Sequence, residues 1–125
     1  MPRGEAMFWK EWFRDKSHRT NENHAVRDVL RRNGDDGSAI RHVVHYAYPR
    51  SGIDPSQRGR IAADLSSQGF KVRDAASNDG LVFEHHRAVA GRAFDDLTDE
   101  LESWFEKRGW EYDGWECAVV RGKLN

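Results

Sequence analysis

Residues 91–115 read GRAFDDLTDELESWFEKRGWEYDGW, and this stretch decides what fold the rest of the chain is expected to adopt. Its apolar residues recur at the spacing of one side of a 3.6-residue helix, and they are Phe94, Leu97, Leu101, Trp104 and Phe105. The pattern predicts an amphipathic helix over residues 92–108, followed by a glycine and by a strand that begins near Glu111. A helix with one apolar stripe has to bury that stripe, so a sheet is expected beneath it.

The same helix carries a second stripe, which is acidic. Its members stand four, three and four residues apart, and they are Asp95, Asp99, Glu102 and Glu106. One interpretation is a docking surface for an Arg-rich segment of a partner protein, since a carboxylate accepts two hydrogen bonds from a guanidinium group. The other is a solvent-exposed face, because exposed charged residues usually do no more than keep a helix hydrated.

The strand after the helix opens with the pentapeptide EYDGW at residues 111–115. Strict alternation would put Tyr112 and Gly114 on one face of the sheet and Asp113 and Trp115 on the other. A glycine inside a strand often marks a bulge or the close approach of another chain. Two hypotheses follow: a bulge that turns Trp115 into the core, or a partner-binding contact formed by Tyr112, Asp113, Gly114 and Trp115.

Upstream of the helix, turn signals divide the chain into short elements. Residues 40–48 are rich in valine and tyrosine and have apolar residues at both parities, which indicates a strand inside a sheet. The sequence DPSQ at residues 54–57 predicts the start of a helix, and residues 70–75 alternate as a strand with one exposed face. The triplet NDG at residues 78–80 predicts a hairpin, so residues 81–88 should return antiparallel.

These elements form two successive strand–helix–strand units. Because strand crossovers are right-handed, the units are expected to interleave into a four-stranded antiparallel sheet with both helices on one side, a ferredoxin-like α+β sandwich. A further helix is expected over residues 21–33, after an aromatic segment that contains MFWKEWF at residues 7–13. We expect that helix and segment to cover the other side of the sheet. The predicted organisation is an aromatic N-terminal segment over residues 1–19 and a single ferredoxin-like domain over residues 20–125.

Composition narrows the class of function. A chain of 125 residues with a formal net charge of -1 has neither the length for two ordinary domains nor the basic excess that nucleic-acid binding favours. Arg27, Arg31 and Arg32 are better explained by a hydrated helix face than by a nucleic-acid patch, so direct contact with nucleic acid is not expected. The single cysteine, Cys117, has no internal disulfide partner, and neither a secretory leader nor a membrane span is recognisable. A cytoplasmic protein is therefore expected.

Four histidines, at positions 42, 45, 85 and 86, fall on the two strands that this topology places side by side at the centre of the sheet. Within each pair the spacing puts the two rings on opposite faces, so at most one histidine from each strand converges with one from the other. Zinc sites need three or four converging ligands, so packed or hydrated histidines are favoured over a metal or general-base site. Phosphate-cradling loops and nucleophile motifs are missing, and no catalytic residue, metal or cofactor is expected.

A known family has a similar arrangement. The pentapeptide after an amphipathic helix, the glycine-aromatic strand entry at Gly69 and Phe70, and the order of elements resemble the regulator of ribonuclease E activity B proteins of bacteria. The resemblance covers roughly residues 20–120. It implies a non-catalytic, cytoplasmic, ferredoxin-like protein that binds endoribonuclease E, or another protein of the RNA-degradation machinery, and lowers RNA cleavage.

The sequence leaves three hypotheses open. The first is a regulator that binds an RNA-degrading enzyme by protein contact. The second is a histidine-dependent hydrolase acting on a phosphodiester, for which His42 or His86 would be needed, and the third is a general interaction or immunity-type module with another target. The lack of a convergent catalytic set in the sequence favours the first and third, and the family resemblance separates them. Nothing in the sequence indicates the oligomeric state.

Overall fold

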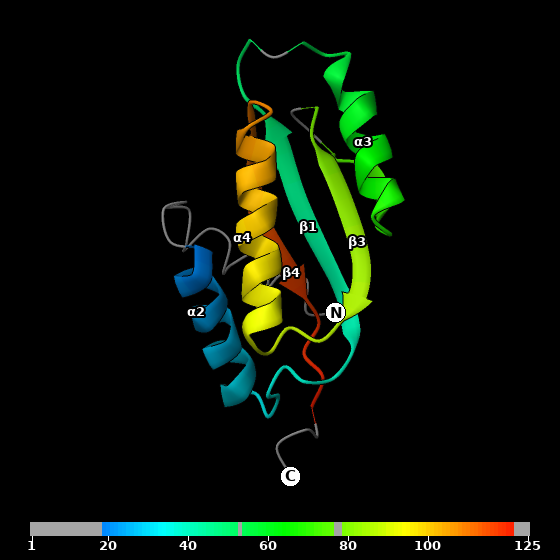
Figure 1. Ribbon diagram of the computed structural model, residues 1–125. Coiled ribbons are helices and arrows are strands. Elements are labelled where there is room, and N and C mark those ends of the chain that lie inside the picture. Colours follow the sequence, from blue (N-terminus) through cyan, green and yellow to red (C-terminus); the bar gives the residue numbers. More distant parts are fainter. Residues whose placement is uncertain (1–18, 53, 77–78, 122–125) are drawn as a thin grey trace.

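The computed structural model describes residues 19–52, 54–76 and 79–121 (Figure 1). In chain order the elements are α2 (Arg19–Arg32), β1 (Arg41–Pro49), α3 (Gln57–Ser67), β2 (Lys71–Asp74), β3 (Leu81–Arg87), α4 (Arg92–Glu106) and β4 (Trp110–Cys117). Each helix and strand predicted from residue 20 onward is present, with bounds that differ by a few residues at most. The predicted aromatic N-terminal segment lies outside the described residues.

The four strands form one antiparallel sheet in the order β2-β3-β1-β4. β1 lies inside the sheet, as its apolar pattern predicts, and its His45 pairs with Phe83 of β3 and with Trp115 of β4. The strand begins one residue later than predicted, and Ile40 is 70% exposed. Strands of the two strand–helix–strand units alternate across the sheet, which confirms the predicted interleaving and the ferredoxin-like α+β arrangement.

Glycine residues end α3 and α4, as predicted. Gly69 and Gly109 have φ angles of 97° and 78°, in the left-handed region that a side chain would disfavour. The hairpin between β2 and β3 also forms as predicted, and it is closed by the N–H of Ala75, which donates to the carbonyl oxygen of Gly80 at 2.9 Å. The local turn chemistry of the sequence therefore accounts for where these elements stop.

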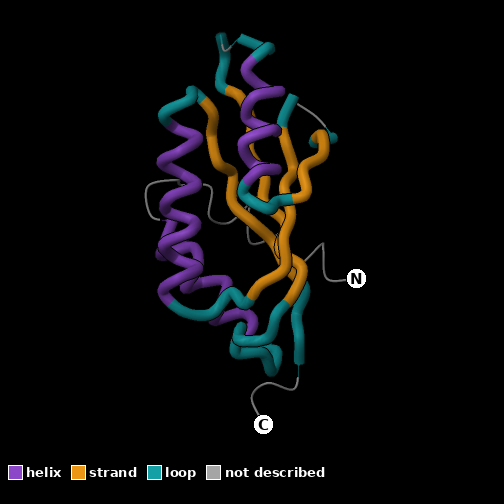
Figure 2. The backbone as a smooth tube through the Cα atoms, turned by 45° about the vertical axis from the view of Figure 1, so that its right-hand side comes forward, coloured by secondary structure: helices purple, strands orange, loops and turns teal. Residues whose placement is uncertain are grey.

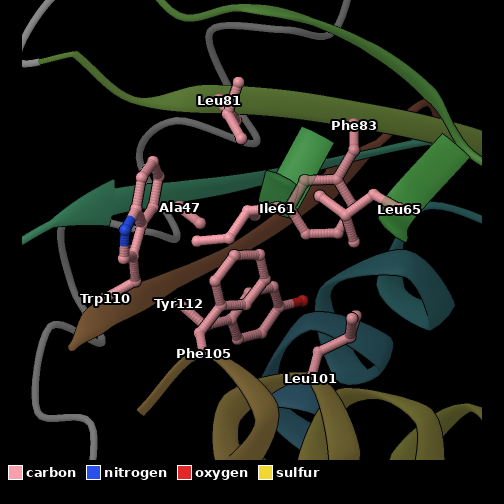
Figure 3. Close-up of a cluster of buried hydrophobic side chains, with 9 residues drawn as sticks. All are labelled: Ala47, Ile61, Leu65, Leu81, Phe83, Leu101, Phe105, Trp110 and Tyr112. Carbon is pink, nitrogen blue, oxygen red and sulfur yellow. The ribbon is translucent and has the colours of Figure 1, made fainter. Parts of the chain in front are cut away.

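Helices α3 and α4 lie over one face of the sheet, and their apolar side chains meet there (Figure 1). Figure 3 shows Ile61 and Leu65 of α3 directed toward Phe83 of β3. Leu101 and Phe105 of α4 enter the same buried cluster, whose other members are Ala47, Leu81, Trp110 and Tyr112. Burying a side chain of this size stabilises a fold by about 1.5–3 kcal/mol, so the cluster holds both helices firmly on the sheet.

Helix α2 packs against α4 on that same side of the sheet, so the prediction that it covers the opposite side is wrong. Val26 and Leu30 of α2 join a second buried cluster, whose other members are Val43, Val89, Phe94, Trp115 and Cys117. Figures 1 and 2 show α2 lying along the half of α4 that begins at Arg92. Its apolar side packs there against Phe94 of α4 and Trp115 of β4, whose rings meet edge to face.

The last strand contains a β-bulge at the pentapeptide. Its register to β1 skips from Gly114 to Tyr112, so Asp113 is the extra residue, and Gly114 has a φ of 101°. The bulge resets the alternation and places Trp115 on the same side as Tyr112, with the two residues 4% and 2% exposed. The bulge hypothesis is therefore confirmed, whereas the strict alternation that put the two rings on opposite faces is wrong.

A buried ion pair fastens the end of the domain where α2, β1 and β4 meet. The side chains of Asp35 and Arg41 are 0% and 1% exposed, and Arg41 donates to both carboxylate oxygens. Asp35 also accepts the N–H groups of Gly37 and Val120, each at 2.8 Å, and Arg41 donates to the carbonyl oxygen of Ala118 at 3.0 Å. Burial raises the pKa of Asp35, but these donors outweigh burial and hold it below its ordinary value.

Candidate functional site

The acidic stripe predicted on the long helix divides into two parts. Asp95 faces α2, where its carboxylate accepts hydrogen bonds from the guanidinium of Arg27 at 2.9 and 3.1 Å and from the amide of Asn23 at 3.0 Å. Burial raises the pKa of Asp95, but these donors outweigh burial and lower it below its ordinary value. Asp95 thus holds α2 against α4, and binding of a partner by its carboxylate would compete with that ion pair.

The remaining members of the stripe lie on the outward side of α4. Asp99 and Glu106 are exposed, Glu102 is half-buried, and Asp96 is exposed beside them. We call Asp96, Asp99, Glu102 and Glu106 the outer acidic surface. Along its N-terminal half runs an open hollow of about 630 Å³ between α2 and α4. Partner binding by this surface stays a prediction.

The pentapeptide in β4 is mostly buried. The indole N–H of Trp115 donates to the side-chain oxygen of Asn23 at 2.8 Å, and Tyr112 is buried in the core. Gly114 is buried at the bulge, and Asp113 is half-buried beside it. Contact with a partner through this strand stays a prediction, and Asp113 is the member of the motif placed best for it.

Two histidines from facing strands meet inside the core, on the side of the helices. The Nε2 atom of His45 lies 2.9 Å from Nε2 of His85, and its Nδ1 atom lies 2.8 Å from the hydroxyl oxygen of Tyr112. His45 is 0% exposed, and the ring of Phe83 stacks on it with the centroids 5.0 Å apart. The prediction that one histidine from each strand converges is confirmed on this face, where both ring nitrogens of His45 have partners.

The pKa of each histidine in this pair is lower than its ordinary value, which favours the neutral form of both rings near pH 7. Burial lowers the pKa of His45 well below its ordinary value, and repulsion from a protonated His85 and from Arg87 lowers it further. Burial and the charge of Arg87, followed by the two outer histidines, lower the pKa of His85 to about 4. A group with so low a pKa is a poor proton acceptor near pH 7, so the pair fits a hydrogen-bonded core better than a general-base site.

The other two histidines meet on the opposite face of the sheet. The rings of His42 and His86 are stacked with their centroids 5.1 Å apart, and Nε2 of His42 lies 2.6 Å from a carboxylate oxygen of Glu84. Arg73 donates to the other oxygen of that carboxylate, also at 2.6 Å. Within residues 19–52, 54–76 and 79–121, no group of three or more potential metal ligands converges.

A groove of about 840 Å³ runs between α3 and α4, and sequence reasoning did not anticipate it. Phe70, His85 and Arg87 lie on its sheet side, and Leu97 and Trp104 are among the residues that α4 contributes. The guanidinium carbon of Arg108 lies 3.8 Å from the centre of the Trp104 ring and covers it. Trp104 is only half-buried although it belongs to the apolar stripe of α4. A large aromatic residue at the edge of that stripe is the feature of the sequence that could have indicated the groove.

Comparison with known proteins gives a family match over nearly all of this structure. The family model described as regulator of ribonuclease activity B matches residues 20–117. The matched range starts within the first turn of α2 and ends with the last residue of β4. No curated protein was found to match the chain. In the part of the chain that the structure describes, no helix has both the length and the apolar character needed to cross a membrane.

Proposed function

The chain belongs to the regulator of ribonuclease activity B family, and from that membership we propose that it binds endoribonuclease E, or another protein of the RNA-degradation machinery, and lowers RNA cleavage. The regulator acts by protein contact and catalyses no reaction itself, and its place of action is the cytoplasm. The observation that carries the proposal is the extent of the match. Residues 20–117 include the whole sheet and α4, the helix that presents the outer acidic surface.

The outer acidic surface is the proposed contact for a basic segment of the ribonuclease. It stands on a helix whose inner side is fixed by Phe94, Leu101 and Phe105, which are 0%, 7% and 0% exposed. Carboxylates on a well-packed helix need little ordering when they bind, which reduces the entropic cost of association. Exposed ion pairs of this kind contribute mainly to the rate and specificity of binding, and salt weakens them.

The arrangement of the histidines favours this non-catalytic role over the hydrolase hypothesis. His45 is enclosed with both ring nitrogens hydrogen-bonded, and its neighbour His85 has a pKa of about 4. On the opposite face, His42 lies against the carboxylate of Glu84 and the ring of His86. Each of these rings therefore has a structural partner at its position.

The proposal is tested by the affinity of the purified protein for full-length endoribonuclease E, measured by isothermal titration calorimetry at low and high salt. Neutralising the surface with Asp99→Asn and Glu106→Gln together should weaken binding about three- to tenfold at low salt and less at high salt. Asp79→Asn is the matched control, because Asp79 is exposed in the β2–β3 turn with a φ of 55° that asparagine tolerates.

Two outcomes would count against this account in different ways. Absence of binding by the wild-type protein at either salt concentration would remove the proposed function. Binding that the doubly neutralised variant retains in full would remove the outer acidic surface as the contact, while the regulatory role would stand.

A further inference from the structure

The groove between α3 and α4 contains an arginine, Arg87, that has no carboxylate partner among the described residues. Arg87 is half-buried, its Nε donates to the carbonyl oxygen of Ala88 at 3.0 Å, and its guanidinium carbon lies 5.2 Å from the centre of the Phe94 ring. Among the described residues no carboxylate forms an ion pair with it, whereas the shielded arginines of α2 and β1 each have one. Withdrawing a guanidinium from water costs free energy that a nearby anion would offset.

His85 adds a hydrogen-bond donor beside this arginine. Its Nε2 atom is taken by His45, whose Nδ1 atom in turn faces the hydroxyl group of Tyr112. If the tyrosine hydroxyl donates to His45, then His45 donates from Nε2 to His85, and neutral His85 must carry its own proton on Nδ1. In this direction of the chain, Nδ1–H of His85 remains available to a ligand.

The remaining lining of the groove is apolar in the middle and charged at the rim. Phe70, Leu97 and Trp104 are half-buried and provide the apolar surface. The rim carries both signs of charge, with exposed carboxylates at Asp64 and Glu100 and bases at Lys107 and Arg108. A ligand that complements this lining has an apolar group, one anion for the floor, and at least one cation for the rim carboxylates.

We propose that this groove binds a segment of a partner protein that carries an apolar side chain next to a single aspartate or glutamate and is flanked by a basic residue. The carboxylate is bound by the guanidinium of Arg87 and by Nδ1–H of His85. The apolar side chain packs on Phe70, Leu97 and Trp104. That the partner belongs to the RNA-degradation machinery rests on the function proposed above.

Charge distinguishes this occupant from a nucleic acid. A strand of RNA brings a phosphate at every nucleotide, and its backbone would pass the carboxylates of Asp64 and Glu100 at the rim. A peptide with one acidic residue brings a single anion to Arg87 and leaves the rim carboxylates to a basic neighbour. The groove has a cation, Arg87, on its floor and carboxylates, Asp64 and Glu100, at its rim, and this arrangement of charge favours a peptide over RNA.

The test uses short random peptides displayed on phage and selected on the wild-type protein after depletion on the variant Arg87→Gln. Selected peptides should share an apolar residue adjacent to an aspartate or glutamate. Their affinity should fall about tenfold to a hundredfold in Arg87→Gln, which is the usual effect of losing a charge-assisted hydrogen bond. The control Arg60→Gln removes an exposed arginine of α3 that does not line the groove, and it should leave the affinity unchanged.

Nuclear magnetic resonance locates the bound peptide. The indole N–H signal of Trp104 and the side-chain signals of Leu97 and His85 should shift in the wild-type protein. Because Arg87 also packs on Phe94, Arg87→Lys serves as a second variant that keeps the charge, and it should lose less affinity than Arg87→Gln. A melting temperature near that of the wild type shows that either variant is folded.

Several results would overturn the inference. These are peptides that lack a carboxylate, peptides that bind Arg87→Gln as well as wild type, shifts confined to other surfaces, and an oligouridine that binds the groove through Arg87. Endoribonuclease E separates this inference from the proposed function. If the ribonuclease binds wild type and Arg87→Gln equally while the peptides distinguish them, the groove serves a different partner. If no peptide distinguishes the two proteins but the ribonuclease binds, the proposed function stands and the groove inference fails.

Discussion

Replacing Asn23 by alanine should loosen α2 from the rest of the domain. Asn23 is 0% exposed; its side chain accepts from the indole of Trp115 at 2.8 Å and donates to Thr98 at 2.8 Å and Asp95 at 3.0 Å. Without Asn23 the buried indole N–H loses its acceptor, which costs about 1–3 kcal/mol. Thr98 keeps its bond to the carbonyl oxygen of Asp95, and Asp95 keeps Arg27, so these two residues add about 1 kcal/mol.

The expected total, about 2–4 kcal/mol, is measured as the free energy of unfolding in urea. A double-variant cycle isolates its main cause. Phenylalanine has no N–H group, so Trp115→Phe should cost about 1–2 kcal/mol less in the Asn23→Ala background than in the wild type. The control is Asn33→Ala, which removes one bond, from the side chain of Asn33 to the carbonyl oxygen of Val29 at 2.8 Å, and should cost about 0.5–1.5 kcal/mol.

A cost of less than about 0.5 kcal/mol for Asn23→Ala, or a double variant that is additive within that margin, would contradict this prediction. Either result would mean that α2 is not held to α4 and β4 through this side chain.

The remaining predictions concern stability. Asp35→Ala should destabilise the fold by about 3–5 kcal/mol, because it leaves Arg41, whose side chain is 1% exposed, as an unpaired buried charge; an unchanged melting temperature by circular dichroism would contradict this. Gly80→Ala should lower the free energy of unfolding in urea by about 1–3 kcal/mol, since a Cβ atom there would lie 2.4 Å from a tyrosine ring. At Gly59 an added Cβ atom would have no other atom within 4 Å, so Gly59→Ala should be neutral or stabilise α3 by up to about 1 kcal/mol. Equal effects of the two substitutions would contradict the clash at Gly80. The pKa of His85 falls from 6.5 to about 4 on folding, so its contribution to stability is complete above pH 6.5 and is lost as the pH falls toward 4. Discounted for partial exposure, this loss is about 1–2 kcal/mol. In urea titrations across that pH range, the free energy of unfolding of His85→Gln should therefore decline by about that much less than the free energy of unfolding of the wild type.

Local patterns in the sequence predict the elements and their pairing because each signal acts over a few residues. The apolar stripe from Phe94 to Phe105 lies on the sheet as its helical period requires. The turn at Gly80 and the glycines at 69 and 109 mark where elements end. The order of two strand–helix–strand units then leaves few topologies that keep right-handed crossovers, and the interleaved sheet is one of them.

The position of α2 was not predictable in the same way. Its apolar side, with Val26 and Leu30, would fit either face of the sheet, and the choice depends on partners distant in sequence. The deciding contacts include Asn23, a polar residue that sequence patterns assign to the surface but that is buried against Trp115. The extra residue at the bulge, Asp113, likewise moves the side chain of Trp115 to the other face of the sheet. Strict alternation along the sequence does not predict this change.

The candidate site could be predicted only in part, because it too depends on contacts between residues that are distant in sequence. The spacing of the histidines indicates which rings share a face, and His45 and His85 do meet. The acidic stripe is present, but the removal of Asp95 from it by Arg27 depends on the packing of α2. Nothing in the sequence singles out Arg87, because the lack of a carboxylate around it among the described residues is a property of the folded arrangement of α3, α4 and β3.

The central claim, regulation of a ribonuclease by protein contact, is tested most directly by the rate at which purified endoribonuclease E cleaves a defined RNA in the presence of increasing amounts of the wild-type protein. The account predicts that the rate falls and levels off once a stoichiometric complex has formed, and that the protein alone leaves the RNA intact. An unchanged cleavage rate with the protein in excess, or cleavage of the RNA by the protein on its own, would contradict it.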